Sequence, residues 1–105
     1  MSERDQPLPP AGSVLGGLPQ TPWFTEDSAR FEAALEVLAQ LAAALTAQIT
    51  VEQNVDEPDQ DRIRALRAER ASLAVTRQQL RSTDKPAVSG ILRDLGPKAA
   101  AALRR

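Results

Sequence analysis

The chain has 105 residues, with 13 Lys and Arg against 14 Asp and Glu, and it contains no Cys and no His. A chain of this length forms at most one small domain with a modest core. Without Cys and His it cannot build a thiolate or imidazole zinc site, a Ser-His-Asp triad or a Cys-His nucleophile. We therefore expect no enzymatic activity, no metal and no cofactor.

The charges are distributed unevenly along the chain. Residues 1–61 hold eleven acidic residues and two arginines, whereas residues 62–105 hold eleven Lys and Arg and three acidic residues. Such asymmetry is a hint of a nucleic-acid or membrane partner. In an antiparallel helix pair, however, it would set an acidic helix beside a basic one and select their register. We favour this internal pairing and keep nucleic-acid binding as the alternative.

Residues 1–22 contain five of the eight prolines and three of the five glycines. Because proline fixes φ and glycine resists ordering, we expect an extended or disordered arm without regular structure. Its apolar residues have two interpretations: a floppy terminus whose last aromatics pack on the helices, or a peptide that docks on a partner. The candidate partner-binding residues are Leu15, Leu18, Trp23 and Phe24.

The first ten residues are charged and rich in proline, so they do not resemble a secretory signal. We expect no apolar segment long enough to cross a bilayer, and therefore a cytoplasmic protein without a membrane partner. The Ala- and Arg-rich composition is typical of a bacterium with a GC-rich genome.

The first predicted helix covers residues 26–53. Thr25 is a plausible N-cap, and Glu26 and Asp27 place negative charge in the first turn, where the helix dipole favours it. Apolar residues then recur every three or four positions, which indicates one buried stripe. The stripe contains Phe31, Leu35, Leu38, Ala42, Leu45 and Ile49.

The second predicted helix covers residues 58–81, with Asp56 or Glu57 as the cap and Pro58 in the first turn. Its leucines, spaced by seven, indicate a narrow seam of the coiled-coil type. The seam contains Leu66, Leu73 and Leu80, with arginines at positions 70 and 77. Two long helices joined by a short loop most simply form an antiparallel hairpin.

The C-terminal segment predicts two short helices, over residues 86–95 and 97–105. Asp84 is the expected cap of the first, Gly96 is expected to adopt a left-handed conformation that ends it, and Pro97 to begin the second. These helices would fold back over the hairpin.

The segment ILRDLGPKAAAAL resembles the helix-hairpin-helix motif of DNA-repair and recombination proteins. In that family the amides of a tight turn and a helix N-terminus hold a DNA phosphate. Leu95, Gly96, Pro97, Lys98 and Ala99 match the second half of the motif, but Asp94 stands where its first turn glycine belongs. A carboxylate there would face the phosphate, so we favour a plain junction between two helices.

The sequence therefore predicts an all-α protein with an N-terminal arm and one helical domain over residues 23–105. The predicted function is a non-catalytic protein–protein interaction module, a structural or regulatory subunit or adaptor that binds a protein partner or a second copy. The residues of its helical interface or core are Phe31, Leu38, Leu45, Leu66, Leu73 and Leu80. In the alternative function, the phosphate contacts are Arg64, Arg67, Lys98, Arg104 and Arg105.

Overall fold

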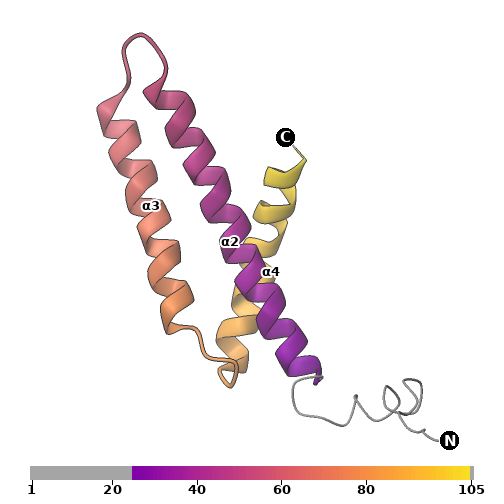
Figure 1. Cartoon of the computed structure of the whole chain (residues 1–105). Coiled ribbons are helices and arrows are strands. Elements are labelled where there is room, and N and C mark those ends of the chain that lie inside the picture. The colour runs from indigo at the N-terminus through magenta and orange to yellow at the C-terminus, as the bar shows by residue number, and fades with distance from the viewer. Residues whose placement is uncertain (1–24, 105) are drawn as a thin grey trace, which may run out of the picture.

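The protein is all-helical over residues 25–104, which a computed structural model describes. It contains α2 (Glu26–Gln53), α3 (Gln60–Gln79) and α4 (Lys85–Leu103), and these residues form no strand (Figure 1). The predicted all-α class is confirmed. The arm, with its candidate residues Leu15, Leu18, Trp23 and Phe24, lies outside the described residues, as does Arg105.

Helix α2 begins where the sequence places its cap. Thr25 Oγ1 accepts a hydrogen bond from the backbone N–H of Ser28 at 3.1 Å, which satisfies one of the free donors of the first turn. The helix then continues for 28 residues, about 42 Å at 1.5 Å per residue.

The length and composition of α2 correct one expectation. No segment was expected to be long and apolar enough to cross a bilayer, but α2 meets both criteria. Its residues 37–51 carry no charge, since they consist only of Ala, Leu, Val, Ile, Gln and Thr. The core helix of a soluble protein meets the same criteria, so this property alone does not place α2 in a membrane.

Helix α3 is shorter at both ends than predicted. Its cap is Asp59, whose carboxylate accepts from the N–H of Arg62 at 3.0 Å, and neither Asp56 nor Glu57 takes this position. Glu52 Oε2 also accepts from the N–H of Asp59 at 3.1 Å and fixes the chain at this point. At the other end Leu80 leaves the helix in an extended conformation and is buried.

The predicted pair of C-terminal helices is wrong, because α4 runs unbroken through Gly96 and Pro97. Asp84 does cap its start, accepting from the N–H of Ala87 at 3.1 Å. Gly96 does not adopt a left-handed conformation. A proline inside a helix costs about 3 kcal/mol, but Leu95 and Ala99, on either side of it, pack inward and Ala99 is only 1% exposed. Burial of the residues on both sides of Pro97 therefore offsets the local cost.

Helix α2 is the central element of the fold. α3 returns alongside α2 after a short loop, and α4 lies against another side of α2 (Figure 1). The buried residues form two clusters. One joins α2 to Leu80 and the first half of α4, and the other joins α2 to the start of α3. The first contains Ala34, Leu38, Leu80, Val88 and Ile91, and the second Leu45, Ile49, Ile63 and Leu66.

Candidate protein-binding groove

An apolar groove lies where the three helices face one another. Its volume is about 330 Å³. From α2 it is lined by Leu41, Ala44, Leu45 and Gln48, from α3 by Glu69 and Leu73, and from α4 by Leu95, Lys98, Ala101 and Ala102. We call this hollow the α3–α4 groove, because these two helices form its walls. The alanines leave space that larger side chains would fill.

The groove exists because α3 and α4 do not pack on each other. Each packs on α2, and within residues 25–104 the two make no close backbone contact with each other. In Figure 1, α4 crosses α2 at an oblique angle, and its C-terminal end lies farther from α3 than its start does. The hollow therefore lies between two helices that spread apart.

The two walls of the groove carry opposite charges. Glu69 lies on the α3 wall and Lys98 on the α4 wall, and neither has an ion-pair partner among the described residues. A second hollow of about 360 Å³ lies between the same two helices, nearer to the loop that joins them. It is lined by Thr76, Gln79, Leu80, Asp84, Ala87 and Ile91.

A polar hollow at the start of α2 is a poorer candidate, because three of its charged groups, Asp27, Arg30 and Lys85, already contact other side chains. The Nζ of Lys85 lies 3.1 Å from the carboxylate of Asp27, and Arg30 Nη2 donates to Ser89 Oγ at 2.9 Å. These contacts tie the first turns of α2 and α4 together. The polar residues that line this hollow therefore have a structural role, which is to hold α2 and α4 together.

The described residues carry their polar and charged side chains outside the core. None of the buried residues is polar or charged, and within this part of the chain no group of three His, Cys, Asp or Glu could hold a metal ion. The shifted pKa values belong to an exposed neighbouring pair: a hydrogen bond from Arg93 lowers the pKa of Asp94, and the same bond raises the pKa of Arg93. Neither residue lines the groove.

The residues predicted for the helical face lie around the two core clusters. Leu38, Leu45, Leu66 and Leu80 are buried, whereas Phe31 and Leu73 are partly buried against the core. Two of them, Leu45 and Leu73, also line the groove. Their burial leaves little of them free for a partner outside the groove.

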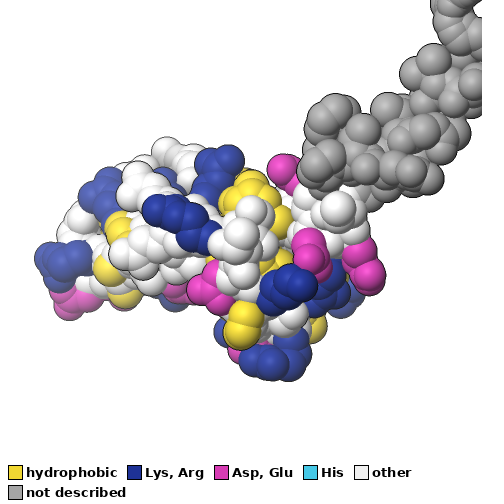
Figure 2. All heavy atoms as spheres, turned by 90° about the horizontal axis from the view of Figure 1, so that it is seen from below, with side chains coloured by type: hydrophobic (Ala, Val, Ile, Leu, Met, Phe, Trp, Pro, Cys, Tyr) yellow, Lys and Arg dark blue, Asp and Glu magenta, His cyan; other side chains and the backbone are white. Residues whose placement is uncertain are grey.

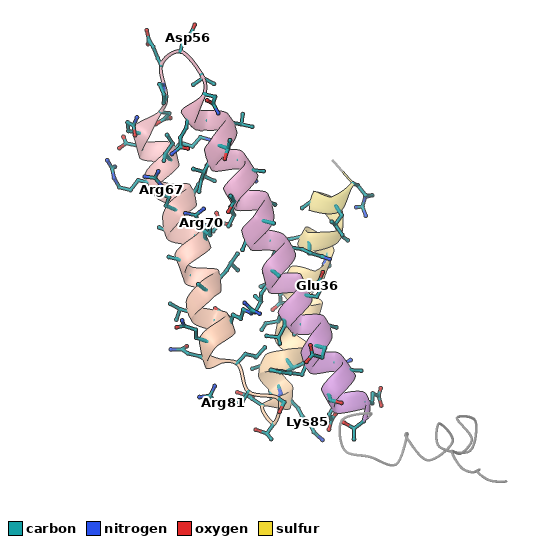
Figure 3. All side chains as sticks on the ribbon, viewed as in Figure 1. Glu36, Asp56, Arg67, Arg70, Arg81 and Lys85 are labelled. Atoms are coloured by element: carbon teal, nitrogen blue, oxygen red, sulfur yellow. The ribbon has the colours of Figure 1, made fainter. Side chains whose placement is uncertain are left out.

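The candidate phosphate contacts do not come together. Arg64 is paired with Asp61 at 2.7 Å, and Arg67 points away from α2 (Figure 3). Lys98 and Arg104 belong to α4, which does not pack on α3. On the face seen from below, Lys and Arg are interspersed with Asp and Glu (Figure 2).

The backbone of residues 94–98 does not have the conformation of a helix-hairpin-helix motif. That motif requires a tight turn with free amides before its second helix. Residues 94–98 are instead inside α4, where the amides are part of the helix. Asp94 pairs with Arg93 at 2.9 Å and is exposed.

The arginines of the α3 seam contribute to packing on α2. Arg70 Nη1 donates to Thr46 Oγ1 at 3.0 Å, so the guanidinium points toward α2 (Figure 3). One ion pair joins α2 and α3 among the described residues, Arg62 with Glu52 at 3.7 Å. The opposite charges of the two helices are therefore close in one place only.

Sequence reasoning did not identify the groove as a site. Leu41 lies beside the apolar stripe predicted for residues 26–53, and Leu95 was matched to the helix-hairpin-helix motif, but nothing local indicates that either residue lines a groove. Lys98 was singled out for phosphate binding instead of for the groove. Only the separation of α3 from α4, which depends on tertiary packing, reveals the site.

Comparisons with protein families, with curated proteins and with solved structures find no match to this chain.

Proposed function

We propose that the protein is a non-catalytic interaction module, built on an antiparallel helical hairpin, that binds an α-helix of another protein chain in the α3–α4 groove. The observation that carries this proposal is the α3–α4 groove itself: α3 and α4 both pack on α2 and leave a hollow between them that Leu41, Leu73 and Leu95 line. An amphipathic helix laid in such a groove is a common mode of recognition.

The size of the core supports the same conclusion. Ten apolar residues are buried among the described residues, and Leu38 is the one large side chain that is less than 2% exposed. Small domains bury a limited part of their surface and often depend on association. A helix in the groove would cover Leu41, Leu73 and Leu95, which are now partly exposed.

The N-terminal arm is part of the proposal as a second contact. Leu15, Leu18, Trp23 and Phe24 are apolar residues in a segment that cannot form a helix readily. They would extend the interface beyond the groove.

A substitution that places a charged side chain in the groove tests the proposal. Ala101 lines the groove, whereas Ala100 is exposed on the same helix and does not line it. We expect Ala101→Arg to abolish capture of binding proteins from the native host at high salt and Ala100→Arg to leave it unchanged. Equal capture by both variants would contradict the proposal.

If the protein instead binds nucleic acid, its binding should weaken as the salt concentration rises, whereas binding of an apolar protein partner should persist at high salt. Phosphate contacts release counterions, so retention on a polyanion resin would fall steeply as salt rises. We expect weak retention at moderate salt, because the basic side chains are interspersed with acidic ones (Figure 2). Strong retention that Arg67→Glu abolishes would favour nucleic acid.

A further inference from the structure

A small hollow with a different chemistry lies between α2 and α3. Its volume is about 150 Å³, and no residue of α4 lines it. Its lining combines apolar side chains with two arginines: Leu38, Ala39 and Ala42 come from α2, and Arg70, Leu73, Ala74 and Arg77 come from α3. We call this hollow, with its two arginines, the α2–α3 furrow. It shares only Leu73 with the α3–α4 groove.

No acidic side chain lines the furrow within the described part of the chain. Its α2 residues belong to the stretch 37–51, which carries no charge. The acidic residues that border this stretch are engaged elsewhere. Glu36 accepts a hydrogen bond from Gln40 Nε2 at 3.0 Å, and Glu52 pairs with Arg62 at 3.7 Å. The positive charge of the furrow is therefore not neutralised within residues 25–104.

Both guanidinium groups have donors left for a partner. Arg70 is half-buried, and its bond to Thr46 Oγ1 at 3.0 Å holds the guanidinium over the furrow and uses one of its five N–H donors. Arg77 is exposed, and its side chain makes no hydrogen bond or ion pair to another described residue. A guanidinium binds a carboxylate through two parallel hydrogen bonds, so the furrow is suited to carboxylates.

We propose that the α2–α3 furrow binds an acidic amphipathic helix of another protein. Arg70 and Arg77 are seven residues apart, which is about 10.5 Å along α3. A helix with acidic residues seven positions apart presents their carboxylates on one face at the same spacing. An apolar side chain four positions after the first acid lies between them, above the hollow. Such a helix matches the furrow in both charge and apolar contact.

The apolar lining favours a protein segment over nucleic acid. An apolar hollow of about 150 Å³ has room for a group the size of benzene, and thus for one aliphatic side chain. A phosphate gains nothing from apolar walls, and no aromatic residue among those described lines the furrow as a platform for base stacking. Because the furrow and the α3–α4 groove are separate hollows, this inference does not depend on the proposed function.

The test titrates the full chain into a fluorescently labelled peptide and follows its anisotropy at about 150 mM salt. The probe is an alanine-based helical peptide of about 20 residues with Glu, Leu and Glu at positions i, i+4 and i+7. A twin peptide carries Gln in place of each Glu. We expect the acidic peptide to bind and its twin to bind about tenfold more weakly, because carboxylates form the stronger bonds with guanidinium groups.

Charge reversal in the furrow tests the role of its arginines. Arg77→Glu should weaken binding of the acidic peptide by about tenfold or more, since like charges then face each other. Arg64→Glu is the matched control, because Arg64 is also exposed on α3 but pairs with Asp61 and does not line the furrow. For this variant we expect less than about a twofold change, because salt screens distant exposed charges. Circular dichroism checks that both variants remain helical.

A second pair of variants tests the apolar contact. Ala74 lines the furrow, whereas Ala71 is exposed on α3 and does not line it. Ala74→Gln fills the hollow without adding a charge, so it should weaken peptide binding by about threefold or more, because the peptide's leucine loses its apolar contact. Ala71→Gln should leave binding unchanged. Ala101→Arg, which changes the α3–α4 groove, should also leave it unchanged.

Three results would overturn the inference. One is an acidic peptide that binds no better than its Gln twin. Another is a short DNA duplex that binds as tightly as the peptide and is lost in Arg77→Glu but not in Ala74→Gln, which would make the furrow a site for nucleic acid. The third is self-association of the wild-type chain in sedimentation equilibrium that Arg77→Glu abolishes, which would make the occupant a second copy.

Discussion

Gly96 and Pro97 are the residues at which local sequence signals and the fold disagree most. A glycine followed by a proline ordinarily ends a helix, because glycine adopts the left-handed conformation and proline lacks the N–H. Here the residues on both sides of the pair are packed inward. Ala99 is 1% exposed, and Leu95 packs against the first core cluster.

Gly96→Ala distinguishes a continuous helix from a helix end. An added Cβ at Gly96 would meet nothing within 4 Å, and the backbone there is not left-handed. Pro97 follows directly, however, and its ring crowds a Cβ on the preceding residue in the helical conformation, so we expect Gly96→Ala to change the free energy of unfolding by less than about 0.5 kcal/mol in urea unfolding.

Gly90→Ala is the control for this substitution. Gly90 lies in the same helix, and its added Cβ would make only an ordinary contact at 3.8 Å with the side chain of Arg93. Gly90→Ala should stabilise the protein by about 0.5–1 kcal/mol. If Gly96→Ala costs more than about 1 kcal/mol while Gly90→Ala stabilises, the backbone at Gly96 is left-handed and α4 ends there.

The neighbouring pair Arg93 and Asp94 gives a prediction about pH. The hydrogen bond from Arg93 lowers the pKa of Asp94, so its contribution to stability is present above the ordinary carboxyl pKa and is lost as pH falls through the lowered value. We expect an NMR titration to place the Asp94 pKa below that of a model peptide. Arg93→Gln should return it to the ordinary range, and an unchanged pKa in that variant would assign the shift to another group.

At the scale of the helices, caps and periodicity account for most of what could be predicted. Thr25 and Asp84 each bond the N–H three residues ahead, so the starts of α2 and α4 follow from local chemistry. The start of α3 was misplaced because three acidic residues precede it and each could cap. The contact from Glu52 to the N–H of Asp59, which comes from the end of α2, selects among them.

Substitution of the acidic residues before α3 tests which one is the cap. We expect Asp59→Ala to destabilise the protein by about 1 kcal/mol, because the N–H of Arg62 loses its acceptor. Asp56→Ala should change stability by less than about 0.5 kcal/mol, since Asp56 is exposed and outside the helix. Urea unfolding of both variants measures the difference, and equal losses would show that the cap is not specific.

The groove could not be predicted at the level of elements. Each helix has an apolar stripe that the sequence reveals, but whether α3 and α4 touch depends on how both pack on α2.

At the scale of the whole molecule, the central claim is that the α3–α4 groove binds an α-helix of another protein chain. The most direct measurement compares capture of binding proteins from the native host at high salt by two variants, Ala101→Arg in the groove and Ala100→Arg outside it. We predict that Ala100→Arg captures them as the wild-type chain does and that Ala101→Arg does not. Capture by both variants would contradict the claim.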